Sequence, residues 1–110
     1  MVLLFSAVVI FGATSIMGMY LSALILRNKP ASNEVIVIHG LFSMAGFGIL
    51  FAYLPASLMS ISLFAVATLF GIILLYQYLT DKKFTFWLCY AHGITTIAGF
   101  IFLLLLVWQQ

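Results

Sequence analysis

The chain has 110 residues, of which 66% are hydrophobic and only 5% are charged, and its formal net charge is +2. This leaves too little polar surface to cover a water-facing domain, and the few cations flank apolar segments instead of forming a basic face, so no nucleic acid partner is expected. The composition predicts an integral membrane protein whose main partner is the lipid bilayer.

Four long apolar stretches follow one another, each with roughly the ~20 residues that an α-helix needs to cross the hydrocarbon layer. They cover Leu3–Leu26, Asn33–Tyr53, Ser57–Leu79 and Thr85–Trp108. Strands are excluded because the stretches are long and do not alternate between apolar and polar residues. The first stretch is longer than the apolar core of a secretion signal and has no basic residue before it, so we expect a retained helix. The predicted fold class is all-α, a transmembrane four-helix bundle.

The breaks between these stretches carry the signals that end and begin helices. Residues 27–34 close the first helix and offer Ser32 or Asn33 as the N-cap of the second, and Thr85 has the corresponding place after the third break. The middle break, residues 53–57, is short and uncharged, so the helices that it joins should be antiparallel neighbours. Up-down-up-down connectivity is therefore expected.

All four cationic residues fall in the first and third breaks, which lie on one side of such a bundle: Arg27, Lys29, Lys82 and Lys83. The tendency of positive loops to remain inside predicts that this side is cytoplasmic and that both termini lie outside. A bacterial inner membrane is the expected location.

The second half of the chain repeats the first. The segment His39–Phe47 (HGLFSMAGF) matches the segment His92–Phe100 (HGITTIAGF). At the same offset and without a gap, Phe11 matches Phe64 and Gly18 matches Gly71. We interpret this as a tandem duplication of a two-helix unit within one membrane domain, residues 1–110, with repeat 1 at 1–53 and repeat 2 at 54–110.

The two histidines of the chain, His39 and His92, are partners in this repeat. Because each repeat contains two helices, both halves should insert in the same orientation, related by an axis along the membrane normal. The second and fourth helices then lie diagonally across the bundle, and the two histidines come at nearly the same depth. An imidazole in an apolar segment needs a partner, and this pair can share one.

Glycines accompany both histidines. Gly40, Gly46 and Gly48 follow His39, Gly93 and Gly99 follow His92, and Gly18 and Gly71 fall near the same depth on the first and third helices. We expect these glycines to create room around the histidine pair. Small residues also let transmembrane helices pack closely without any ligand, so that interpretation stays open.

Two opposed neutral imidazoles in an apolar bundle suit a flat macrocycle whose central metal is held from both faces. Zinc is a poorer candidate, since it usually takes four protein ligands, and the chain has only one cysteine and two loop carboxylates besides the histidines. We predict one haem b per chain with His39 and His92 as metal ligands. Ser43 and Thr96, one turn beyond each histidine, should bond a backbone carbonyl of their own helix or tune the imidazoles.

The propionates of a haem need water or cations. Because both histidines lie toward the basic loops, the propionates are expected to emerge among Arg27, Lys29, Lys82 and Lys83. Cys89 lies one turn before His92 and is expected to be an inert, buried thiol on the same face. Phe47 and Phe100 are expected to pack in the core or to face lipid, and not to stack on a macrocycle.

At the level of this pattern, with histidine-glycine pairs at His39-Gly40 and His92-Gly93, the chain resembles the four-helix architecture of the cytochrome b561 and bacterial cytochrome b families. Those families hold haem b between histidines on transmembrane helices and exchange electrons with quinones, ascorbate, oxygen species or partner subunits. Members of the b561 type commonly hold two haems with four histidines, whereas this chain has enough for one site.

The resemblance implies an electron-transfer protein, with quinol, a redox partner protein or a larger membrane complex as partner. A haem-dependent oxidoreductase and an electron-transfer subunit without activity of its own both fit. Two alternatives from other classes are a small transporter or proton pathway, in which the histidines relay protons, and a structural subunit of a membrane complex. No nucleophile constellation, acid–base pair or nucleotide loop is present, so hydrolase and transferase activities are not expected.

Overall fold

The computed structural model describes all 110 residues and contains four α-helices. They are α1 (Val2–Leu26), α2 (Asn33–Phe51), α3 (Leu58–Leu79) and α4 (Phe86–Trp108). Each is long and apolar enough to cross a membrane, and the molecule measures 43 × 23 × 19 Å. The prediction of an all-helical chain with four segments of membrane-spanning length is confirmed, and the helix ends differ from the expected ones by no more than two residues.

Polar residues at the breaks set the starts of α2 and α4. Ser32 is the N-cap of α2, and its Oγ accepts a hydrogen bond from the backbone N–H of Val35 (3.4 Å). Thr85 precedes α4 but is held by a side chain of α3, because Gln77 Nε2 donates to Thr85 Oγ1 (2.9 Å) and Gln77 Oε1 accepts from the Thr85 N–H (3.2 Å). Both predicted capping residues therefore lie just outside their helices. Ser32 caps α2 with its own side chain, whereas Thr85 makes no side-chain cap and is held by Gln77 of α3.

α1 and α3 end in the same way. Asn28 and Asp81 adopt left-handed backbone conformations, with φ of 54° and 53°. In both loops the N–H of the following residue donates to the carbonyl five residues earlier, at 2.9 Å. Asn and Asp enter this region more readily than other residues with a side chain, so each helix stops where such a residue follows it.

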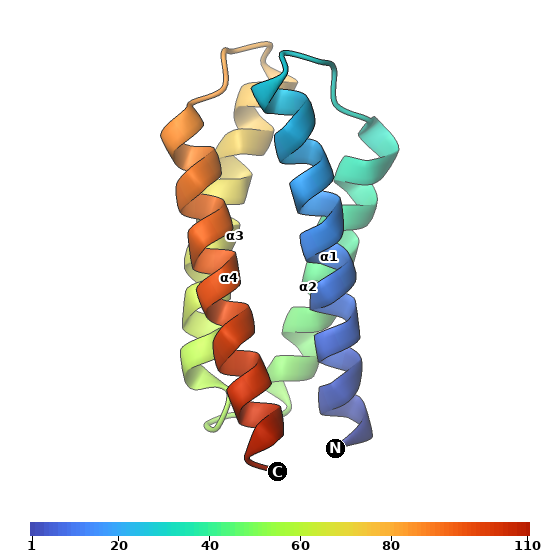
Figure 1. Cartoon of the computed structure of the whole chain (residues 1–110), viewed down its shortest axis with the longest axis vertical. Helices are drawn as coiled ribbons and strands as arrows, with labels where there is room; N and C mark the ends of the chain where they lie inside the picture. Colours follow the sequence, from blue (N-terminus) through green and yellow to red (C-terminus); the bar gives the residue numbers. More distant parts are fainter.

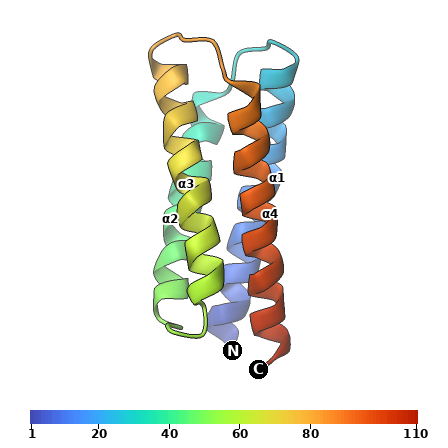
Figure 2. The same cartoon turned by 90° about the vertical axis from the view of Figure 1, so that its left-hand side faces the viewer.

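The helices form two hairpins, α1–α2 and α3–α4, which stand side by side (Figures 1 and 2). Both charged loops lie at one end of the molecule, and the two termini and the α2–α3 connection lie at the other (Figure 1). The hairpins contact each other mainly through α1 and α4, whereas α2 and α3 touch at few points. α2 and α4, which carry the histidines, are therefore diagonal to one another.

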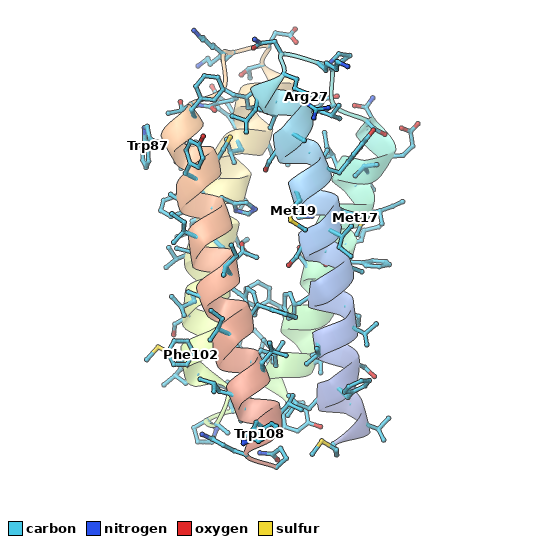
Figure 3. All side chains as sticks on the ribbon, in the orientation of Figure 1. Met17, Met19, Arg27, Trp87, Phe102 and Trp108 are labelled. Atoms are coloured by element: carbon cyan, nitrogen blue, oxygen red, sulfur yellow. The ribbon has the colours of Figure 1, made fainter.

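The buried core occupies the half of the bundle that is remote from the charged loops. Its eight members come from all four helices: Leu4, Ala7, Phe11, Leu50, Ile61, Phe64, Leu103 and Leu106. The outer surface is covered by exposed apolar side chains, as expected of helices that face lipid. Figure 3 shows Trp87 and Trp108 near opposite ends of α4, where tryptophans commonly anchor a helix at the membrane interface.

At the top of this core two phenylalanine rings stack on each other across the bundle. The rings of Phe11 and Phe64 have centroids 4.1 Å apart and are almost parallel, at 3°. Phe47 contacts both rings edge-on at 6.4 Å, so the expectation that it packs in the core is confirmed. Gly46 and Gly99 provide the space, since an added Cβ would lie 2.6 Å from the Phe11 ring and 3.1 Å from the Phe64 ring.

Gly46→Ala should lower the free energy of unfolding by about 1–3 kcal/mol, the usual cost of overpacking a filled core. The new methyl would strike Cε2 and Cζ of Phe11 at 2.6 Å, and this ring cannot retreat because its other face is stacked on Phe64. Thermal unfolding in detergent, followed by circular dichroism, measures the loss. Gly40→Ala is the matched control, because a Cβ there meets nothing within 4 Å; equal stability of the two variants would contradict the packing argument.

Candidate functional site

The two histidines face each other inside the bundle, His39 from α2 and His92 from α4. Their ring centroids are 6.2 Å apart and their planes are inclined by 63°. Both side chains are half-buried, and each bonds a neighbouring backbone instead of the other ring. The imidazoles thus share one level of the bundle while remaining separate.

Each imidazole is held by the neighbouring helix of its own hairpin. His39 Nδ1 lies 3.0 Å from the carbonyl oxygen of Thr14 on α1, and His92 Nδ1 lies 2.6 Å from the carbonyl oxygen of Ala67 on α3. A carbonyl can only accept, so Nδ1 carries the proton in both rings. In the tautomer with its proton on Nδ1, Nε2 has a free lone pair, and this is the form of histidine that binds a metal through Nε2.

Gly18 and Gly71 make this arrangement possible. Each lies four residues after the carbonyl that the histidine bonds, so the imidazole rests directly over the glycine. A Cβ at either position would lie 3.1 Å from Cε1 of the histidine ring. These two glycines, expected from the sequence to create room, create it for the imidazoles.

The remaining glycines divide into two groups. Gly46 and Gly99 lie beneath the stacked phenylalanines, as described above. Gly40, Gly93 and Gly48 have no atom within 4 Å of an added Cβ. The positions directly after the histidines, which the repeat pattern singled out, therefore have open space beside them and no packed neighbour.

Ser43 and Thr96 make equivalent contacts in the two halves. Ser43 Oγ donates to the carbonyl of His39 (2.8 Å), and Thr96 Oγ1 donates to the carbonyl of His92 (2.7 Å). The predicted bond to the carbonyl of their own helix is confirmed. Because these hydroxyls are used by the backbone, they do not bond the imidazole nitrogens.

Cavities lie on both sides of the histidine pair. The larger, of about 110 Å³, extends toward the charged loops and is lined by all four helices and by Ala31 and Phe84 of those loops. The smaller, of about 30 Å³, extends to the Phe11–Phe64 stack, which forms its floor. Both cavities include His39 and His92, so the imidazoles stand in one interior space that continues toward the loop end.

The four cations are exposed and lie in the two loops at that end (Figures 1 and 3). Lys82 packs on Tyr76, with Nζ 4.9 Å from the ring centroid and 3.5 Å from the hydroxyl. Ala31 and Phe84, in the same loops, line the larger cavity. The two loops toward which the cavity extends therefore carry all four cations of the chain: Arg27, Lys29, Lys82 and Lys83.

The two imidazoles are the metal-ligating side chains that the histidine pair provides. No group of three or more His, Cys, Asp or Glu side chains lies together anywhere in the chain. Cys89 is a buried free thiol on the wall of the larger cavity that His92 also lines, as expected from its place one turn earlier. The histidine pair contributes one imidazole from α2 and one from α4.

Three features of the site escaped the sequence reasoning. The backbone carbonyls that orient the histidines leave no mark in the side-chain pattern. The stacked phenylalanines were visible only as one matched pair of the repeat. Tyr78 lines the larger cavity and donates to Asn33 Oδ1 of the other hairpin. The internal repeat did not point to this residue, because the position that matches it in the first half is Ile25.

Comparisons of this chain with protein-family models, with curated proteins and with solved structures found no match in any of the three. The functional interpretation therefore depends on the geometry and chemistry of the site. Two oriented, neutral imidazoles facing each other in an apolar interior are its central feature.

Proposed function

We propose that this protein is an integral-membrane b-type cytochrome that holds one haem b between His39 and His92 and transfers electrons. The observation that carries the proposal is the 6.2 Å between the two ring centroids. A metal–nitrogen bond is about 2 Å long and a ring nitrogen lies about 1.1 Å from the ring centre, so two imidazoles on one metal have centroids about 6 Å apart. The spacing supports a metal between the rings.

The contacts behind each imidazole support the same interpretation. Metal-binding histidines commonly donate their second ring N–H to a carbonyl or carboxylate, which fixes the tautomer and the ring orientation. His39 and His92 both do so, through the carbonyls of Thr14 and Ala67. With Nδ1 bound to a carbonyl in both rings, Nε2 is the nitrogen that remains for a metal in each.

The donor count favours haem over a bare ion. Zinc needs about four ligands, and this level of the bundle provides two. Haem iron takes four nitrogens from its own macrocycle and two axial ligands from the protein. Bound here, haem b would supply a one-electron redox centre, and His39 and His92 would be the residues that hold it.

The surroundings fit an amphiphilic macrocycle with its carboxylates toward the loops. The cavity wall is mainly apolar, the Phe11–Phe64 stack closes it from below, and the loops toward which it extends carry Arg27, Lys29, Lys82 and Lys83. Pockets for ligands of this size measure about 300–1,000 Å³, more than the 110 Å³ of the larger cavity. Binding therefore requires the two hairpins to move apart at the loop end.

We further propose an up-down-up-down bundle that arose by tandem duplication, in a bacterial inner membrane with the basic loops in the cytoplasm and both termini outside. Equivalent contacts in the two halves, such as the two histidine–carbonyl bonds, support the duplication. The electron partner is expected to be a quinol or a respiratory subunit, with the protein acting alone or within a larger complex.

The visible spectrum of the purified protein tests this function. Protein from haem-replete cells should have sharp reduced α and β bands, about one haem per chain by the pyridine haemochrome assay, and a low-spin electron paramagnetic resonance signal when oxidised. Colourless protein that gains no bands when hemin is added would overturn the assignment. The remaining candidates would then be the transporter and the structural subunit.

A further inference from the structure

The two hairpins are joined at the loop end by one side-chain hydrogen bond. Tyr78, next to the last residue of α3, donates from its hydroxyl to Oδ1 of Asn33, the first residue of α2. Other side-chain bonds remain within one hairpin, except that Ser57 in the α2–α3 turn bonds Leu50 at the opposite end (2.7 Å). Tyr78–Asn33 is thus the polar link across the α2–α3 seam in the half that contains the cavity.

This link lies where the bundle is least well packed. α2 and α3 make the fewest contacts of any neighbouring helices, and the buried core that joins the hairpins lies in the other half. Tyr78 also lines the larger cavity, together with Ile36 of α2 and Leu75 of α3. Breaking one hydrogen bond would therefore loosen the seam directly beside the cavity.

The link is present on one side only. In the repeat, Tyr78 corresponds to Ile25 of α1, and Asn33 corresponds to Phe86 of α4. Those two side chains cannot hydrogen-bond, and their seam is held by the larger contact between α1 and α4. The two seams of the bundle thus differ: α1 and α4 make the larger contact, whereas α2 and α3 are joined at the loop end by the Tyr78–Asn33 hydrogen bond.

We infer that the α2–α3 seam is a lateral entrance from the membrane to the histidine cavity, and that the Tyr78–Asn33 hydrogen bond is its latch. The ligand that it admits is a flat, largely apolar molecule dissolved in or adsorbed to the bilayer, and its identity as haem rests on the proposed function. Such a ligand is larger than the cavity of about 110 Å³, so the hairpins must separate at this seam to admit it.

Cys89 provides a probe of this entrance that does not depend on haem. It is the single cysteine of the chain and lines the cavity, so its modification by N-ethylmaleimide reports how often the cavity opens. In the apo-protein in dodecyl maltoside, Tyr78→Phe and Asn33→Ala should each speed labelling about two- to tenfold, the factor that corresponds to one exposed hydrogen bond. Hemin uptake by the same samples should accelerate by a similar factor.

Tyr76→Phe is the matched control. Tyr76 lies on the same helix, is exposed and contacts Lys82, but does not reach the other hairpin, so both rates should equal those of the wild type. Wild-type labelling rates in Tyr78→Phe and Asn33→Ala, with unchanged helical circular dichroism, would overturn the latch. Faster labelling without hemin uptake in any variant would support the entrance and overturn the haem assignment.

Discussion

In the proposed cytochrome, His39→Ala and His92→Ala should each abolish the sharp reduced α and β bands of the purified protein. A low-spin haem needs both axial nitrogens, and no other His, Cys, Asp or Glu joins the pair at this level of the bundle. With one imidazole removed, a bound haem would be expected to give broad bands and a high-spin signal. Haem content should fall as well, because the remaining histidine holds the iron from one side only.

Two controls separate loss of a ligand from loss of the fold. Helical circular dichroism of both variants should match the wild type, since the buried core lies in the other half of the bundle. His39→Gly and His92→Gly leave a space of imidazole shape, and free imidazole should restore the low-spin bands in part. A low-spin spectrum that persists in either single alanine variant would show that the ligand assignment is wrong.

The fold could be predicted in detail because the hydrocarbon layer sets a minimum helix length. Each apolar stretch had to cross it as a helix, so the interrupting polar residues marked the ends to within two positions. The errors at Ser57 and Thr85 have one cause, because both residues precede a helix and use their side chains outside it. From a sequence it is hard to tell whether such a residue is the last one before a helix or the first one in it.

The site could be predicted as a pair of histidines but not as a constellation. The internal repeat predicted that His39 and His92 lie at equal depth. It did not predict which groups each imidazole contacts. The Thr14 and Ala67 carbonyls could not be predicted, since every residue offers a carbonyl and only the packing of α1 on α2 and of α3 on α4 selects one. The Phe11–Phe64 stack depends in the same way on how the hairpins meet.

The glycines illustrate this limit most clearly. From the sequence, all members of the set were expected to create room around the histidine pair, with Gly40 and Gly93 singled out because they directly follow the histidines. In the structure, the imidazoles lie against Gly18 and Gly71, and the phenylalanine rings lie against Gly46 and Gly99. Gly40 and Gly93 have open space beside them. A glycine's effect depends on what approaches it from another helix, and this information lies outside its own segment.

This division leads to the second large effect. Gly71→Val and Gly18→Val should each weaken hemin binding about 10- to 100-fold, the usual range for loss of a contact that orients a metal ligand. The Cβ alone would lie 3.1 Å from Cε1 of the facing histidine, and the two methyl groups of valine leave no room for the ring. The imidazole must then leave the carbonyl that fixes its tautomer. Hemin titration of the apo-protein measures the affinity.

Gly93→Val and Gly40→Val are the matched controls, because they place the same side chain directly beside the same histidines but on open faces. Hemin affinity in these variants should remain within about twofold of the wild type, as expected of substitutions that touch no packed neighbour. The reverse order, with position 93 sensitive and position 71 tolerant, would mean that the glycines after the histidines line the ligand directly. Residues other than Gly18 and Gly71 would then have to hold the imidazoles in place.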